Sequence, residues 1–168
     1  MLQVTKTKLE GVLLIQPPTI FEDFRGSYVE TYNEELYQKA GIIKMVQDDI
    51  STSSRHVLRG LHGDGETWKL VSCPYGKFYL VVLNYDQESK QFGQWESFAL
   101  SDTNRLQVLI PPKFGNGHLI LSETAIFHYK QSCYYNRAGQ FSIAWNDARF
   151  KIWWPVKDPV LSQRDAGL

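Results

Sequence analysis

The sequence predicts an all-β fold, a barrel or sandwich of short strands with one small helix. Segment 77–85 (KFYLVVLNY) is apolar at adjacent positions, which is typical of a strand covered on both faces. Further short apolar segments follow it, separated by turn residues at the spacing of sandwich and barrel strands. Aromatic residues make up 14% of the chain, which suits packing on a β-sheet.

The one predicted helix lies in the N-terminal third of the chain. Asn33 is a favourable N-cap, and Glu34 and Glu35 would occupy the first turn, where carboxylates interact well with the helix dipole. Gly41 follows as a residue suited to the turn after a helix end. These signals predict a short helix between Asn33 and Gly41.

After the buried segment, turn chemistry alternates with further predicted strands, which are 93–100, 106–110, 118–121, 125–135 and 140–145. Because successive side chains in a strand point to opposite faces, Tyr129 and His128 should lie on opposite faces of the fourth of these strands. Segments 151–155 and 159–168 are expected to be irregular. The whole pattern predicts one compact barrel.

Length and charge narrow the class of protein. At 168 residues the chain fits a single domain, 1–168, with one core. Lys plus Arg and Asp plus Glu both total 18, so no overall field would attract nucleic acid or an anionic membrane. No apolar run is long enough to span a bilayer, and the N-terminus lacks the apolar core of a signal peptide. Cys73 and Cys133 form no CxxC pair, so we expect reduced thiols in a cytoplasmic protein.

The most informative motif is Leu58-Arg-Gly-Leu-His62, followed seven residues later by Lys69. A neutral imidazole can accept a proton near pH 7, and a nearby ammonium can stabilise the oxyanion that results. Buried cations are costly unless they are paired or used. The alternative interpretation is a structural histidine with two surface cations at a strand end, and the motif alone leaves both open.

No metal site is expected. A mononuclear centre needs three or more ligands brought together, commonly including an HxH pair. His62 is followed by Gly63 and Asp64, and the four histidines, at 56, 62, 118 and 128, show no ligand spacing. A cation at Lys69 would also oppose a bound metal.

Many short motifs, taken together and in order, resemble one family. They are Phe21-Glu-Asp-Phe-Arg-Gly26, Gln47-Asp-Asp49, Leu58-Arg-Gly-Leu-His62, Lys69-Leu-Val71, Ile110-Pro111, Leu121-Ser122, Tyr129-Lys130, Trp145-Asn-Asp147 and Trp154-Pro155. Their order and approximate spacing are similar to those of the dTDP-4-dehydrorhamnose 3,5-epimerase family. The resemblance implies a cupin-type jelly-roll barrel with one or two short helices, no metal or organic cofactor, and a homodimer formed by strand exchange.

The resemblance also implies an activity, the inversion of C3, C5 or both in a nucleotide-diphospho-4-keto-6-deoxy sugar for bacterial surface polysaccharide synthesis. It makes His62 the general base and Asp165 the carboxylate that orients it. Lys69 would stabilise the enolate, and Tyr129 would return a proton to the opposite face. A C–H beside a ketone is acidic only because its anion is an enolate, so base and cation must act together. A tyrosine hydroxyl, a poor acid in water, can serve when desolvated beside Lys69.

The substrate-binding positions implied by the resemblance are Arg25, Glu30, Gln47, Asp49, Arg59, Asn116, Gln140 and Arg164, with the arginines suited to a diphosphate. Several depart from the family. Its Gly-Phe-Ala-His-Gly-Phe block stands here as Lys113-Phe-Gly-Asn-Gly-His118, so that Asn116 replaces the histidine. Asn116 can still donate a hydrogen bond to the C4 oxygen but cannot shuttle a proton. His118 is expected on the same strand face about 7 Å away, too far to take its place.

Other departures are Asp49 for an asparagine, Gln140 for a glutamate and Arg164 for a lysine. The loop 63–68 is also shorter than usual, which puts the thymidine nucleotide in doubt. The motifs His62-Gly-Asp64 and Thr67-Trp-Lys-Leu-Val71, with Cys73 and Tyr75-Gly76, resemble the branch that acts on GDP-4-keto-6-deoxy-heptoses in capsule synthesis. The sequence therefore leaves three points open. The nucleotide is GDP or dTDP, the sugar is a hexose or a heptose, and inversion occurs at C3 alone or at both C3 and C5.

Two other functions remain possible from the sequence. The same enolate machinery could move a ketone between C4 and C3, as a 3,4-ketoisomerase does, and loss of Tyr129 as an acid would favour that reaction. A non-catalytic barrel that binds sugar nucleotides would be favoured by a broken His–Asp pair or a missing lysine. His62, Asp165, Lys69 and Tyr129 are all present, which favours epimerisation.

Overall fold

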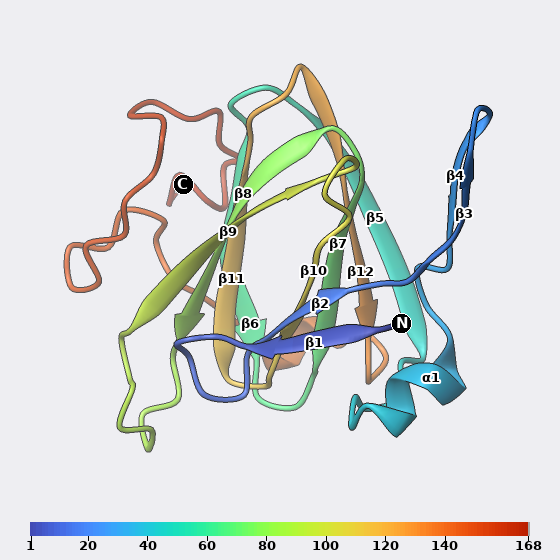
Figure 1. Ribbon diagram of the computed structural model, residues 1–168. Coiled ribbons are helices and arrows are strands. Elements are labelled where there is room, and N and C mark those ends of the chain that lie inside the picture. Colours follow the sequence, from blue (N-terminus) through green and yellow to red (C-terminus); the bar gives the residue numbers. More distant parts are fainter. Residues whose placement is uncertain (168) are drawn as a thin grey trace.

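The computed structural model describes residues 1–167 and consists mainly of two antiparallel sheets that face each other (Figure 1). The first sheet has the strand order β1 (Gln3–Lys6), β2 (Leu13–Gln16), β10 (Gln107–Ile110), β7 (Lys69–Tyr75), β12 (Thr124–Gln131), β5 (Gln47–Ser54). The second has the order β13 (Gln140–Ser142), β6 (Leu58–Asp64), β11 (Phe114–Ile120), β8 (Lys77–Asn84), β9 (Trp95–Ser101). The all-β prediction is confirmed.

The buried strand predicted at 77–85 is β8, and it is covered on both faces as expected. Phe78 and Leu80 pack in the core between the sheets, together with side chains from β7, β10 and β12. Val81 and Leu83 pack instead in a second cluster on the outer face, where Trp154 of the C-terminal segment covers them. The irregular C-terminal segment therefore covers part of the outer face of the second sheet.

The predicted helix is α1 (Glu34–Lys39), and its ends have the expected chemistry. The side chain of Asn33 accepts a hydrogen bond from the backbone N–H of Leu36, at 3.1 Å. Gly41 follows with a φ of 81°, a value that favours glycine. One additional turn of 3₁₀ helix lies at Arg137–Gly139. Among residues 1–167, no helix is long and apolar enough to cross a membrane.

The predicted strand bounds differ from the observed ones by three residues or more for β11, β12 and β13, and β13 ends at Ser142 rather than at 145. Strand β12 ends at Gln131 rather than at 135, because Gln131 pairs with the first residues of both neighbouring strands, Gln47 and Lys69. Beyond that point no strand is left to pair with. Strand β11 begins at Phe114 rather than at 118, through a Gly-Asn-Gly stretch of weak strand propensity that pairing with β8 holds extended.

A two-stranded hairpin, β3 (Thr19–Asp23) and β4 (Gly26–Val29), projects away from the sheets (Figure 1). Its apolar side chains are largely exposed, most of all Phe24 at its tip, which is 98% exposed. The hairpin therefore contributes little to the core of its own chain.

Candidate active site

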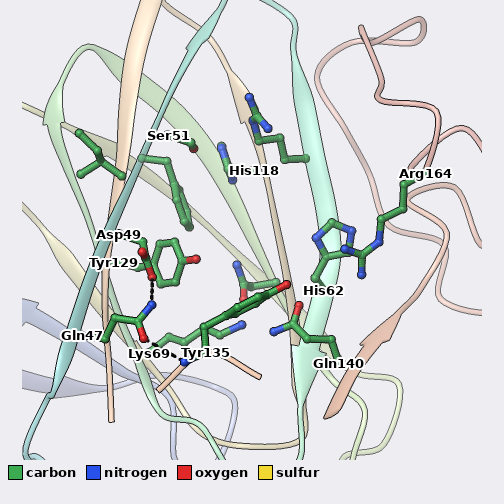
Figure 2. A pocket seen from close by; sticks show the side chains of 14 residues that line it. Gln47, Asp49, Ser51, His62, Lys69, His118, Tyr129, Tyr135, Gln140 and Arg164 are labelled. Carbon is green, nitrogen blue, oxygen red and sulfur yellow. Dashed lines mark hydrogen bonds between the residues drawn. The ribbon is translucent and has the colours of Figure 1, made fainter. Parts of the chain in front are cut away.

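A cavity of about 430 Å³ opens between the two sheets. Most of the predicted site residues line it, namely Gln47, Asp49, Arg59, His62, Lys69, Asn116, Tyr129, Gln140 and Arg164 (Figure 2). His62 and Asn116 come from the second sheet, while Lys69 and Tyr129 come from the first. A ligand in the cavity would therefore have His62 on one side and Tyr129 on the other.

A bulge in β6 brings Arg59 and His62 to the same cavity. Residues three apart in a regular strand point to opposite faces. Here Asn116 pairs with His62 while His118 pairs with Arg59, so β6 holds one residue more than β11 over this span. Gly60 lies within the bulge with a φ of 114°, and a Cβ there would be 2.6 Å from the backbone oxygen of Asn116. Only glycine fits this position.

His62 and Asp165 form a dyad although they are 103 residues apart. Nε2 of His62 and Oδ1 of Asp165 are 2.8 Å apart, and the carboxylate side chain is only 5% exposed. Burial opposes the charged carboxylate, but hydrogen bonds with His62 and Ser162 outweigh it, so the pKa of Asp165 is lowered. Because Nε2 faces the carboxylate, Nδ1 is the ring nitrogen left to accept a proton.

Lys69 and Tyr129 present two different groups to the cavity. Lys69 is 8% exposed, and burial lowers the pKa of its ammonium, partly opposed by the negative charge of Asp64. Burial, with Asp49 and Tyr135, raises the pKa of Tyr129 to about 12. Tyr129 therefore keeps its proton at neutral pH and can give it only to a strong base such as a carbanion.

Amide side chains fix the carboxylate of Asp49 at one end of the cavity. Its Oδ2 accepts hydrogen bonds from Nε2 of Gln47 at 2.7 Å and from Nε2 of Gln131 at 2.6 Å. Oε1 of Gln47 in turn accepts from the backbone N–H of Tyr135, at 2.9 Å (Figure 2). Gln47 and Asp49 therefore have defined positions before any ligand binds.

Two predicted substrate-binding residues do not line the cavity. Arg25 lies at the tip of the hairpin, where its guanidinium is 75% exposed and bonds to Asp23. Glu30 follows the hairpin and also lies outside the lining. Both lie in the segment between β2 and β5, and within one chain the hairpin of that segment carries them away from the site.

Some lining residues were not assigned from the sequence, among them Ser51, Phe127, Tyr135 and His118. The alternation that placed Tyr129 on the inner face also predicts Phe127 there. His118 lines the cavity on the same face of β11 as Asn116, the face on which it was expected. As predicted, His128 lies on the other face of β12, bonded to Ser72. Within residues 1–167, no three possible ligands gather into a metal-binding group.

Comparison with known proteins identifies the family. Residues 6–168 match the family described as dTDP-4-dehydrorhamnose 3,5-epimerase. The epimerase of that name from Salmonella typhimurium LT2 is 40% identical over 172 residues, which cover 99% of this chain and 93% of the Salmonella protein. The chain belongs to this family. Solved structures of family members confirm the cupin-type fold.

One such structure is that of the dTDP-6-deoxy-D-glucose-3,5-epimerase RmlC from Legionella pneumophila, in complex with dTDP-4-keto-L-rhamnose. It is 35% identical, with a TM-score of 0.93, over 99% of this chain and 91% of its own. Another is ChmJ, a 3'-monoepimerase from Streptomyces bikiniensis in complex with dTDP-quinovose. It is 28% identical, with a TM-score of 0.89, over 96% of this chain and 84% of its own. These relatives thus include an enzyme named as an epimerase at two carbons and one named as an epimerase at a single carbon.

Proposed function

We propose that this protein epimerises a nucleotide-diphospho-4-keto-6-deoxy sugar at C3, C5 or both, for bacterial surface polysaccharide synthesis. The observation that carries the proposal is the position of His62 and Tyr129 on opposite sheets, facing one cavity that also contains the ammonium of Lys69. Membership of the family supports the same reaction class.

The first step is removal of a proton from the carbon beside the ketone by Nδ1 of His62. Asp165 bonds to the other ring nitrogen, which fixes the tautomer and stabilises the imidazolium. As the C–H bond breaks, its electron pair moves into the C–C bond and onto the C4 oxygen, and Lys69 stabilises this enolate oxygen. Asn116, paired with His62 across the sheet, can donate a hydrogen bond to the same oxygen.

The second step is return of a proton from the opposite side. The flat enolate lies between the sheets, so the hydroxyl of Tyr129 meets the face that His62 does not. Protonation of carbon from that face inverts the centre. A 3,4-ketoisomerase has no need of an acid on the opposite face, and a binding protein has no need of the His62–Asp165 dyad, so the geometry favours epimerisation over both.

For the substrate, we propose a GDP-linked 4-keto-6-deoxy-heptose. The motifs His62-Gly-Asp64 and Thr67-Trp-Lys-Leu-Val71, with Cys73 and Tyr75-Gly76, support this choice. The family structures described above contain dTDP sugars, which makes dTDP-4-keto-hexoses the direct competitor. Two unpaired cysteines within the described chain, Cys73 and Cys133, support a location in the reducing cytoplasm.

We propose that the protein is a homodimer. The hairpin β3–β4 holds exposed apolar side chains away from its own barrel and carries Arg25 at its tip. Docked on a second copy, the hairpin could bring Arg25 to a substrate diphosphate, a position that it does not reach in its own chain. The exposed apolar surface of the hairpin supports this arrangement.

Deuterium uptake from D₂O tests the reaction. GDP- and dTDP-linked 4-keto sugars are incubated with the protein, and NMR follows exchange and inversion at C3 and C5. His62→Asn should lower exchange by about 10²–10⁴-fold, the contribution of a positioned general base. Tyr129→Phe should retain exchange, since His62 can return deuterium to the original face, while inverted product falls steeply.

Thermal unfolding of both variants serves as the control for folding. Near-normal exchange in His62→Asn would remove His62 from the mechanism. Equal loss of exchange and inversion in Tyr129→Phe would count against the tyrosine as the opposite-face acid. Preferential turnover of dTDP-hexoses would replace the proposed GDP-heptose.

A further inference from the structure

His118 on β11 has no part in the reaction steps above, yet it lines the cavity. Its imidazole is 4% exposed, and Nε2 has no hydrogen-bond partner within the described residues. Buried polar atoms in folded proteins are nearly always paired. An unpaired one in a cavity wall therefore indicates a hydrogen bond that a bound ligand completes.

The imidazole is held in one orientation and in one charge state. It stacks on Phe127 with ring centroids 3.9 Å apart and planes within 6°, and Phe78 packs against it at 5.4 Å. Burial, with Arg59 and His62 nearby, lowers the pKa of His118 to about 3. The ring is therefore neutral at physiological pH. It can offer an N–H or a lone pair to a ligand but cannot serve as a proton carrier.

The strand register shows which part of a ligand His118 would meet. Asn116 pairs with His62 at the reacting centre, whereas His118 pairs with Arg59 one step along the same two strands. Nε of Arg59 donates to Oγ of Ser53 at 3.0 Å, which orients the guanidinium and leaves its terminal nitrogens available. A guanidinium beside a neutral N–H donor suits an anionic oxygen, and the diphosphate is the anionic part of the proposed substrate.

We propose that His118 binds substrate, its Nε2–H donating a hydrogen bond to the diphosphate beside Arg59. The identity of this ligand rests on the proposed function. In the family block quoted above, position 116 is a histidine and position 118 a phenylalanine, whereas here they are Asn116 and His118. The imidazole thus stands two residues further along the strand, where it contributes to affinity and not to proton transfer.

Two variants separate hydrogen bonding from packing. His118→Phe keeps an aromatic ring against Phe127 and removes the donor, while His118→Gln keeps an N–H near the position of Nε2 and removes the aromatic contact. Calorimetry measures binding of GDP, dTDP and inorganic diphosphate to each. Loss of a hydrogen bond to a charged group should weaken nucleoside diphosphate binding by about 10-fold or more in His118→Phe. His118→Gln should bind more tightly than His118→Phe.

A role in packing alone predicts the reverse order, with His118→Phe binding as tightly as the unaltered protein, and that result would overturn the proposal. If His118→Phe does not fold, ¹⁵N NMR of the histidines in the unaltered protein tests the hydrogen bond directly. A neutral imidazole whose Nε2–H resonance shifts on addition of nucleoside diphosphate is expected, and absence of a shift refutes the hydrogen bond.

The two proposals fail separately. Normal nucleotide binding without deuterium exchange would contradict the epimerase function alone. Unchanged binding in His118→Phe, with exchange intact, would contradict the role of His118 alone. An unaltered protein that binds neither GDP nor dTDP would overturn both.

Discussion

At the scale of single residues, Lys69 carries the electrostatic part of the proposed reaction. Its ammonium is buried, and in the part of the chain that the structure describes no carboxylate lies within 4.0 Å of it. Burial therefore lowers its pKa, and the more distant Asp64 opposes this only in part. The negative oxygen of an enolate would pair with the Lys69 ammonium, which has no such partner within the described part of the folded protein.

This lowered pKa predicts an alkaline limit on activity. The protonated ammonium is the form that stabilises an enolate, so exchange should fall as pH rises through the pKa of Lys69, below its ordinary value of 10.5. Tyr129, with a pKa of about 12, would lose its proton only at higher pH. The pH profile of deuterium exchange and an NMR titration of the Lys69 side chain measure the two midpoints. A Lys69 midpoint at or above 10.5 would contradict the expectation.

At the scale of elements, the bulge in β6 decides the composition of the site. Without it, Arg59 and His62 would face opposite sides of the sheet. The bulge depends on Gly60, which has a left-handed φ and lies against the backbone of β11. The nearest atoms to an added Cβ belong to Asn116 and Gly117, and backbone cannot rotate away as a side chain can.

Gly60→Ala should therefore lower the free energy of unfolding by about 3 kcal/mol or more, the range of strained backbone substitutions and core clashes. Gly65→Ala is the matched control, since a Cβ at that position meets no atom within 4 Å. It should change stability by less than about 0.5 kcal/mol. Urea unfolding measures both. Similar stabilities of the two variants would show that β6 does not need glycine at position 60.

At the scale of the whole molecule, the site depends on both facing sheets. They hold the proposed base and the proposed acid on opposite walls of one cavity, and the C-terminal segment supplies Asp165 from outside the second sheet. The hairpin β3–β4 is the one strand pair among residues 1–167 that joins neither sheet. In the proposed dimer, its exposed apolar residues would contact the second copy.

Phe24→Asp should weaken the proposed dimer, because it places a charge on a side chain that is 98% exposed in one chain and would be covered in two. Phe24→Tyr, which keeps the ring, is the control and should remain dimeric. Sedimentation velocity at several concentrations gives the mass of each. An unaltered protein that sediments as a monomer would refute the dimer, and a Phe24→Asp dimer of normal affinity would place the contact elsewhere.

Local sequence determined much of this protein. Hydrophobic runs and turn residues suffice for an all-β fold and for β8, and an N-cap with acidic neighbours suffices for α1, because these signals act between residues close in the chain. The motif that contains His62, followed by Lys69, was recognisable for the same reason. The ordered motifs then indicated the family and, with it, Asp165 and Tyr129.

Only the tertiary structure decided how these residues meet. The bulge adds one residue to β6 and thereby brings His118 beside Arg59, a shift in register that depends on contacts between separate strands. Burial raises the pKa of Tyr129 to about 12, and this burial depends on the packing of both sheets. The hairpin carried Arg25 away from the cavity of its own chain. Strand pairing and burial are long-range properties, so local patterns could not predict them.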